Sequence, residues 1–193
     1  TVGAKKTVNL ENLEGLGARR LAELLLEFSE DAEIKRRLRL ELAGEAGAEV
    51  IAADIAKRLV ALRRAQSFVD WSKRRSFVKD IDLQREMIAT KVAETRPDLA
   101  LDLMWRFMDL AEPILNRVDD SYGDVGDVFR QACRDLGAIA GKAVPDPIQL
   151  ADRVFQAVMI NGYGEYDQLV RVIFSALREP GRARLKSRLS SAL

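Results

Sequence analysis

The chain has 193 residues, 48% hydrophobic and 32% charged, and its 31 Lys and Arg nearly balance 30 Asp and Glu, giving a formal net charge of +1. This composition is typical of a folded chain with a sizeable core, and it excludes disorder and a global attraction to nucleic acid or anionic membranes. The absence of histidine excludes His-dependent catalysis and imidazole zinc sites. Cys133 is the single cysteine, which excludes an internal disulfide and a multi-thiolate metal site.

The same features favour a cytoplasmic protein. A lone cysteine is typical of a reducing compartment, and the apolar helical pattern around Cys133 predicts a small buried side chain. The N-terminal apolar runs are short and interrupted by charge, so we expect neither a signal peptide nor a membrane span. The first residue is Thr1 and not methionine, which is consistent with a processed form or with a piece of a longer chain, and we favour the piece. The apolar face at the very end lacks the polar outer surface of a capping repeat, so we expect the chain to continue past residue 193.

The N-terminal third predicts a tail and three helices. Residues 1–8 have the pattern of a tail, and Asn9 is placed to cap a short turn. Apolar residues spaced i, i+3, i+4 and i+7 then predict a helix over 21–28. Asp31, or Ser29 before it, predicts the cap of a second helix that ends near 44–47, and a third follows over 48–66. The short connections predict antiparallel neighbours.

A longer helix is predicted to begin at Ser67 or Asp70 and to end before Pro97, since proline disfavours helical dihedral angles in the residue that precedes it. The next stretch, 98–111, is apolar on most sides, and Asp102, Arg106 and Asp109 lie on one narrow stripe. A helix of this kind needs neighbours on most sides. We therefore predict that 98–111 is the central helix and that Asp98 caps it.

The C-terminal half predicts four further helices. Residues 116–126 are loop-like, and an amphipathic helix follows from about Asp124. Asp146 followed by Pro147 is a strong start signal for the next helix. Apolar spacing from Tyr166 to Leu177 predicts another, and the sequence Glu-Pro-Gly at 179–181 predicts that the chain restarts there as a last helix.

These elements predict an all-α protein of about nine antiparallel helices without a convincing strand. The later helices begin near 98, 124, 147 and 165, so helix pairs recur every 40 to 50 residues, which is the range of paired-helix repeats. We predict a single all-helical, repeat-like domain over 1–193. A HEAT-like helical-repeat solenoid and an irregular helical bundle are both consistent with this pattern.

Three stretches carry a resemblance to a known family: Phe-Val-Asp-Trp at 68–71 before a basic helix, Arg-Pro-Asp-Leu-Ala-Leu-Asp-Leu at 96–103, and Arg-Val-Asp-Asp-Ser at 117–121 leading to Gly-Asp-Val-Phe at 126–129. Through them the chain resembles a bacterial family of all-helical, repeat-like proteins of uncharacterised function. The resemblance covers most of 9–193 and implies that fold. It implies no catalytic residue.

Positive charge is concentrated between Lys57 and Lys79. This stretch contains eight basic residues and one acidic residue, Asp70, for a net charge of +7. Aromatic side chains interleave with them, and basic groups with stacking aromatics are typical of nucleic-acid surfaces. The alternative is that they line solvated helix faces and helix ends. The candidate binding residues are Lys57, Arg58, Arg63, Arg64, Trp71, Lys73, Arg74 and Arg75. A second basic run, with the same alternative, comprises Arg178, Arg182, Arg184, Lys186 and Arg188.

An acidic stretch lies between the two basic runs. Its carboxylates, Asp119, Asp120, Asp124 and Asp127, are the type of ligand that hard cations prefer. Their spacing does not match an EF-hand, and Asp124 and Asp127 are also placed to cap the next helix. Carboxylates facing each other across a groove would suit acid–base hydrolysis, but no pattern pairs them here. We predict no metal site and no cofactor.

We therefore predict a non-enzymatic helical-repeat interaction module that presents a surface to a protein partner. The sequence contains no catalytic motif, and stacked helix pairs generate extended surfaces. The alternative is a nucleic-acid-binding module that uses the basic patch at 57–79. The oligomeric state is left open.

Overall fold

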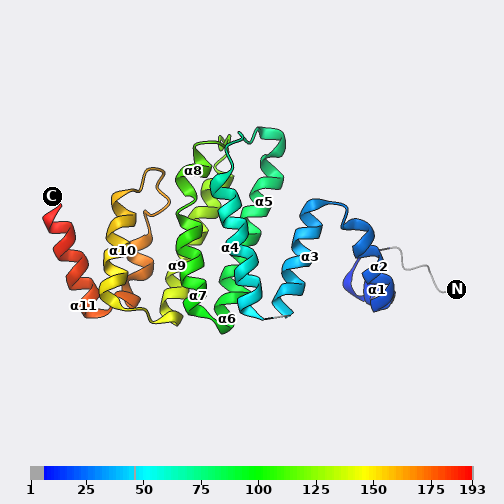
Figure 1. The fold of residues 1–193 in the computed structure, drawn as a ribbon, viewed down its shortest axis with the longest axis horizontal. Helices are drawn as coiled ribbons and strands as arrows, with labels where there is room; N and C mark the ends of the chain where they lie inside the picture. The colour runs from blue at the N-terminus through cyan, green and yellow to red at the C-terminus, as the bar shows by residue number, and fades with distance from the viewer. Residues whose placement is uncertain (1–6, 46, 193) are drawn as a thin grey trace. The chain divides into compact units, whose positions relative to one another are not determined.

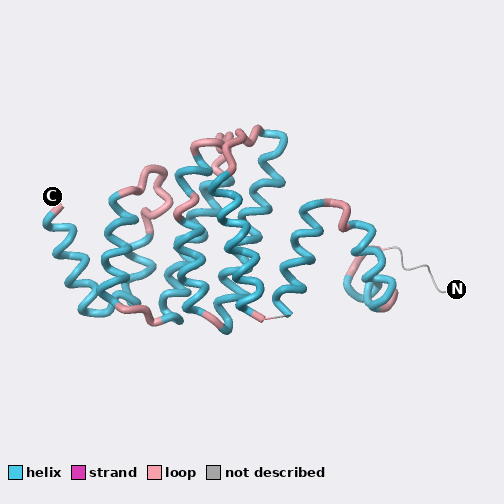
Figure 2. The backbone as a smooth tube through the Cα atoms, in the orientation of Figure 1, coloured by secondary structure: helices cyan, strands magenta, loops and turns pink. Residues whose placement is uncertain are grey.

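The computed structural model describes residues 7–45 and 47–192, and throughout these ranges the regular secondary structure is helical (Figure 1, Figure 2). The predicted all-α fold class is confirmed. The chain divides into two compact units between residues 42 and 43, and each unit is described by itself. Most of the predicted tail, residues 1–6, and the last residue, 193, lie outside the described residues.

The N-terminal unit contains α1 (Leu10–Glu14), α2 (Ala18–Phe28) and the first part of α3 (Ala32–Glu45). Two predicted caps are confirmed. The Asn9 side chain accepts a hydrogen bond from the Asn12 amide at 2.9 Å, and Asp31 Oδ1 accepts from the amides of Glu33 and Ile34 at 2.8 and 3.1 Å. These carboxylate and amide oxygens satisfy N–H groups that the first turn of a helix leaves unpaired.

The second unit is a row of helices that stand side by side (Figure 1). Its elements are α4 (Ala48–Arg64), α5 (Trp71–Met87), η1 (Ile88–Val92), α6 (Ala93–Thr95), α7 (Pro97–Met108), α8 (Ala111–Leu115), α9 (Asp124–Ala143), α10 (Pro147–Met159) and α11 (Leu169–Ser191). Successive long helices run in opposite directions, as predicted, and the loops 65–70, 116–123 and 160–168 lie at the same end of the row (Figure 2).

The predicted central helix corresponds to α7, which contacts α4, η1 and α9. Its apolar side chains are buried, and the rings of Phe107 and Phe129 lie 5.3 Å apart across the α7–α9 contact. The predicted cap is wrong. The helix begins at Pro97, whose missing N–H suits a first helical position, and no side chain caps it. Asp98 lies in the first turn and accepts hydrogen bonds from Arg96 at 2.8 and 3.0 Å.

The long helix that we predicted to end before Pro97 is also present, but it is not uniform. It runs as α5, continues through the π-helical turn η1 and ends with α6. Asp70 caps it by accepting hydrogen bonds from the amides of Ser72 and Lys73. Of the two predicted starts, Ser67 and Asp70, the second is therefore confirmed. Ile88 and Val92 of η1 are buried, whereas Thr90 and Lys91 are exposed, so one side of the wide turn faces the core.

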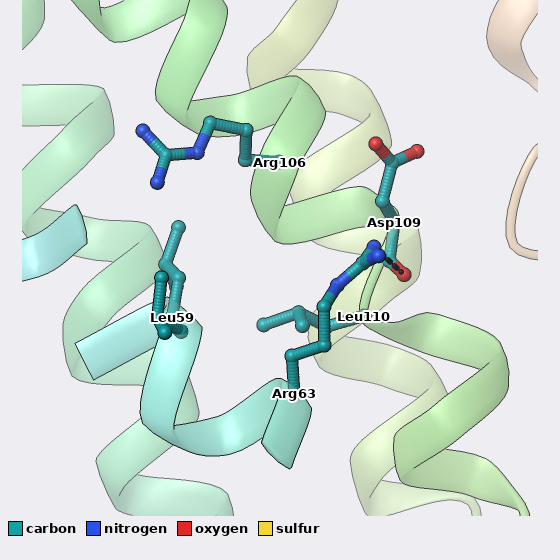
Figure 3. A pocket seen from close by; sticks show the side chains of 6 residues that line it. Leu59, Arg63, Arg106, Asp109 and Leu110 are labelled. Carbon is teal, nitrogen blue, oxygen red and sulfur yellow. Dashed lines mark hydrogen bonds between the residues drawn. The ribbon is translucent and has the colours of Figure 1, made fainter. Parts of the chain in front are cut away.

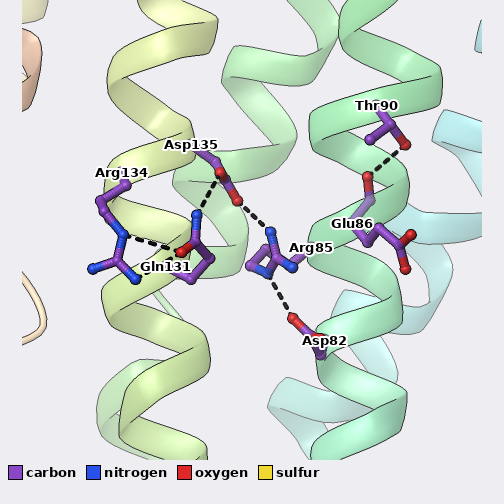
Figure 4. A network of polar contacts seen from close by, with 7 residues as sticks. All are labelled: Asp82, Arg85, Glu86, Thr90, Gln131, Arg134 and Asp135. Atoms are coloured by element: carbon purple, nitrogen blue, oxygen red, sulfur yellow. Dashed lines mark hydrogen bonds and ion pairs between the residues drawn. The ribbon is translucent and has the colours of Figure 1, made fainter.

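Polar side chains join α5 to α9 (Figure 4). Arg85 of α5 donates to Asp82 of its own helix at 2.6 Å and to Asp135 of α9, which also accepts from Gln131 at 3.0 Å. Burial lowers the pKa of Arg85, but the hydrogen bonds to Asp82 and Asp135 outweigh it, so the pKa is raised. Both groups of the inter-helix pair are about four-fifths buried, which makes its loss costly.

Two glycines allow the C-terminal helices to pack closely. A Cβ atom at Gly137 of α9 would lie 2.5 Å from the Val172 carbonyl of α11, and one at Gly181 would lie 2.5 Å from the Pro147 carbonyl. The predicted restart at 179–181 is confirmed, since Arg178 has non-helical dihedral angles and divides α11 into 169–177 and 179–191. The first part of α11 begins at Leu169, three residues later than the Tyr166 at which we predicted this helix to begin.

Candidate functional site

The end of the α4–α5 hairpin is tied to the loop that follows α8. The Val69 amide donates to the Arg117 carbonyl at 2.8 Å, and the Asp119 amide donates to the Val69 carbonyl at 3.2 Å. These bonds form a short parallel bridge between Val69 and Val118. The loops 65–70 and 116–123 therefore have a fixed backbone relation, although they lie far apart in sequence.

The Arg117 side chain adds a second tie. Its guanidinium donates to the carbonyls of Ser67 at 3.1 Å and Leu62 at 3.4 Å, and it lies 5.3 Å from the centre of the Phe77 ring. Burial, followed by the nearby charge of Arg58, lowers the pKa of Arg117. One cationic side chain thus holds the end of α4, the connecting loop and α5 together.

Three large aromatic side chains project from this fixed end into solvent. Phe68, Trp71 and Tyr122 are 62%, 76% and 77% exposed. The Arg74 guanidinium lies over the Tyr122 ring at 4.4 Å, which links α5 to the 116–123 loop once more. We call this set, with the exposed Lys73 and Arg75, the hairpin-end surface. Its members are Phe68, Trp71, Lys73, Arg74, Arg75 and Tyr122.

The predicted basic patch does not form one continuous cationic face, because several of its members have internal partners. Lys57 pairs with Asp54 at 3.3 Å, Arg58 donates to the buried Asp80, and Arg74 pairs with Asp124 at 3.4 Å. Arg63 donates to the Asp109 carbonyl at 3.1 Å, on the side of α4 that faces α7. Arg64, Trp71, Lys73 and Arg75 are exposed near the hairpin end.

The acidic stretch has structural roles in the loop before α9. Asp120 accepts from the amides of Val125 and Gly126, both at 2.9 Å, and so it caps α9 in place of the predicted Asp124 and Asp127. The sequence did not indicate the cap at Asp120, because this residue precedes the helix by four positions and its carboxylate reaches the helix amides across the turn at Gly123. Asp119 accepts from the Ser121 amide at 3.2 Å, and Asp127 pairs with Arg130 at 2.6 Å. Among the described residues no group of three His, Cys, Asp or Glu could hold a metal ion.

The second basic run and the cysteine also have structural roles. Arg184 and Arg188 donate to Asp152 of α10 at 2.9 and 2.8 Å, and Arg178 donates to the Pro145 carbonyl at 2.6 Å. Cys133 is buried as predicted, and burial raises the pKa of its thiol to about 11. These residues hold α10 and α11 in place.

Sequence reasoning missed a groove that runs along α7 and α8. It consists of two adjoining pockets of about 300 and 370 Å³, both lined by Arg63 and Asp109. In the first pocket Arg63 and Arg106 stand beside the apolar side chains of Leu59 and Leu110, and the hydrogen bond from Arg63 to the Asp109 carbonyl is drawn in Figure 3. This part of the groove has two arginine side chains, of which Arg106 also pairs with Asp102 at 3.6 Å, beside an apolar floor.

The second pocket has a different character, with carboxylates and a tyrosine. It is lined by Arg63, Met108, Asp109, Glu112, Pro113, Ile160, Glu165 and Tyr166. Glu165 and Tyr166 are only 5% and 3% exposed. The buried hydroxyl of Tyr166 has no hydrogen-bond partner in the described part of the chain, and burial, followed by the charge of Asp109, raises its pKa.

Hydrogen bonds within the loop after α10 position this pair. Asn161 Oδ1 accepts from the Tyr166 amide at 3.0 Å, and its Nδ2 donates to Asp167 at 2.7 Å. Glu165 Oε2 accepts from the Tyr163 amide at 2.9 Å. Gly164 has φ +75°, which a side chain rarely adopts. The turn at 161–164 is therefore a fixed wall of the second pocket.

These observations define an all-helical protein with an aromatic hairpin end and a charged groove, and none of its described helices has the length and hydrophobicity that a transmembrane segment requires. The chain belongs to a family of unknown function, DUF6880, whose model matches residues 3–193. The predicted membership of an all-helical family of uncharacterised function is thus confirmed. No curated protein and no solved structure matches the chain.

Proposed function

We propose that this chain is a non-enzymatic helical-repeat module of a bacterial cytoplasm that binds a protein partner through the hairpin-end surface. The regular succession of long helices, which begin at 97, 124, 147 and 169, supports the repeat arrangement. The lone buried cysteine supports the compartment.

The observation that carries the proposal is the set of exposed aromatic side chains at Phe68, Trp71 and Tyr122. Aromatic and arginine side chains are the usual anchors of protein interfaces. The Val69–Val118 bridge and Arg117 hold their loops before any partner arrives, so binding would cost little ordering entropy.

The charge distribution favours a protein over a nucleic acid as partner. The basic balance seen in the sequence is offset in space, because Asp124 pairs with Arg74 and Asp119 lies beside Val69. A phosphate backbone would meet these carboxylates together with the lysine and arginine side chains, which weakens the electrostatic attraction that drives such binding. A protein surface of mixed charge fits the hairpin-end surface better.

The test is capture of partners from lysate of the native host, with and without nuclease, by the wild-type chain and by Trp71→Ala. A partner identified from the wild-type capture is then purified and its affinity measured. We expect binding that survives nuclease and is weakened about 30-fold or more by Trp71→Ala, as for an aromatic anchor.

Phe174→Ala is the matched control, because Phe174 is an exposed aromatic residue of α11, away from the hairpin end. It is expected to leave the affinity unchanged. Material released by nuclease would support the nucleic-acid alternative, and partner binding that is equal for the wild type and Trp71→Ala would exclude the hairpin-end surface.

A further inference from the structure

We propose that the second pocket of the groove, between α8 and the 160–166 segment, binds the side chain of an arginine in a polypeptide laid along α7 and α8. This site is separate from the hairpin-end surface. Its existence does not depend on the identity of any partner bound there.

The charges around the pocket favour a cation. Asp109 is neutralised by Arg153, which also lies 5.0 Å from the centre of the Trp105 ring. Glu112 is exposed to solvent at the pocket, and Glu165 is buried. The three carboxylates outnumber Arg63 and Arg153, so the pocket keeps one net negative charge. A single bound cation would neutralise it.

The hydroxyl of Tyr166 is an independent sign of a missing ligand. It is buried in the pocket wall and has no hydrogen-bond partner in the described part of the chain. A buried hydroxyl without a partner carries a desolvation cost that a ligand N–H group can remove. Tyrosine oxygen accepts such a bond readily.

The shape and lining select arginine among cationic side chains. Met108, Pro113 and Ile160 offer apolar contact for an aliphatic stem. The guanidinium is planar and has five N–H donors spread over three nitrogen atoms, so it can donate to several acceptors of the lining at once, whereas a lysine ammonium has three donors on one atom.

The adjoining first pocket explains why we infer a polypeptide and not a free small molecule. Arg63 and Arg106 flank an apolar floor there, and although Arg106 also pairs with Asp102 at 3.6 Å, the two guanidinium groups suit an acidic residue of the same bound segment. A segment with residues of both charges would use both pockets of the groove.

The experiment is a titration of the full chain with N-acetyl-L-arginine amide, which mimics an arginine within a peptide, followed by NMR. We expect saturable binding at millimolar concentration and weaker binding of the equivalent lysine derivative. Tyr166→Phe and Glu112→Gln should each weaken binding about tenfold, the usual effect of removing one hydrogen bond to a charged group.

Tyr166→Phe is suited to this test because the deleted hydroxyl has no hydrogen-bond partner among the described residues, so we expect the fold to be retained. The matched control is Glu94→Gln, at an exposed glutamate of α6 outside the groove. It should bind the probe as the wild type does.

Three outcomes would overturn the proposal. The first is the absence of saturable binding, and the second is equal binding by the wild type and both pocket variants. The third is tighter binding of free L-arginine or spermidine than of the blocked derivative, which would assign the pocket to a small molecule.

Discussion

The hairpin-end surface and the groove lie on the same unit but are built in opposite ways. At the hairpin end the side chains that would meet a partner are exposed, and backbone bonds and Arg117 fix the loops beneath them. In the groove, residues such as Met108 and Tyr166 belong to the buried interior. Binding and folding are therefore separable at the hairpin end, whereas they overlap in the groove.

The largest expected effect is the difference in the free energy of unfolding between a side-chain truncation in the groove and one at the hairpin end. Met108→Ala removes a buried side chain from the groove floor and should cost about 2–5 kcal/mol, while Trp71→Ala at an exposed position should change stability by less than about 0.5 kcal/mol. Urea unfolding measures both. Similar losses for the two variants would show that Trp71 supports the fold.

A second prediction concerns the tie beneath the hairpin end. Arg117→Ala removes hydrogen bonds to two backbone carbonyls and should cost about 1–3 kcal/mol, because the carbonyls of Leu62 and Ser67 lose a charged donor. Hydrogen exchange should become faster at the Val69 and Asp119 amides and stay unchanged in the groove. Arg134→Ala, which removes hydrogen bonds to the Gln131 side chain of the same helix, is the control.

A third prediction concerns the buried Tyr166 hydroxyl, which has no hydrogen-bond partner within 7–45 and 47–192. Tyr166→Phe should leave stability unchanged or raise it by up to about 1 kcal/mol, since it removes a buried hydroxyl without a partner. Thermal unfolding measures the change. A clear loss of stability would mean that the hydroxyl is bonded within the protein and is not available to a ligand.

The smallest expected effect is a pH dependence at the hairpin end. The hydrogen bond from the Ser72 hydroxyl lowers the pKa of Asp70 below its usual 3.8, and the one from Ser121 does the same for Asp119. A lowered pKa in the folded chain means that the stabilisation is present above 3.8 and is lost as the pH falls through the lowered value.

Trp71 directly follows Asp70, so its fluorescence should report this change in acid. Asp70→Asn keeps a capping side chain that does not titrate and should remove the pH-dependent part. A titration that is the same in both proteins would place its origin elsewhere.

Local signals allowed much of the fold to be predicted. Asn9, Asp31, Asp70 and Asp146 cap helices as expected, because a cap involves residues only two or three positions apart. The apolar pattern of 98–111 likewise indicated a central helix. The cap at Asp98 was wrong because Pro97 begins the helix itself.

The candidate sites depended on contacts that no local pattern contains. Arg58 and Asp80 are 22 positions apart and Arg74 and Asp124 are 50 apart, so the sequence suggested a basic surface that the fold partly neutralises. The groove combines α4, α7, α8 and the loop after α10. Arg106 and Asp109, on the polar stripe of the central helix, and Arg63 of the basic patch gave signals that could have located it.

The π-helical turn η1 acts like a one-residue insertion in the helix that carries it. An α-helix turns by about 100° per residue, and a π-helical turn holds one more residue than an α-helical turn. The extra residue therefore changes the direction in which the side chains after the turn point. The turn thereby sets the direction from which Arg96 reaches both Glu49 and Asp98. Family members that lack one residue between positions 88 and 92 would need a different anchor between α4 and the start of α7.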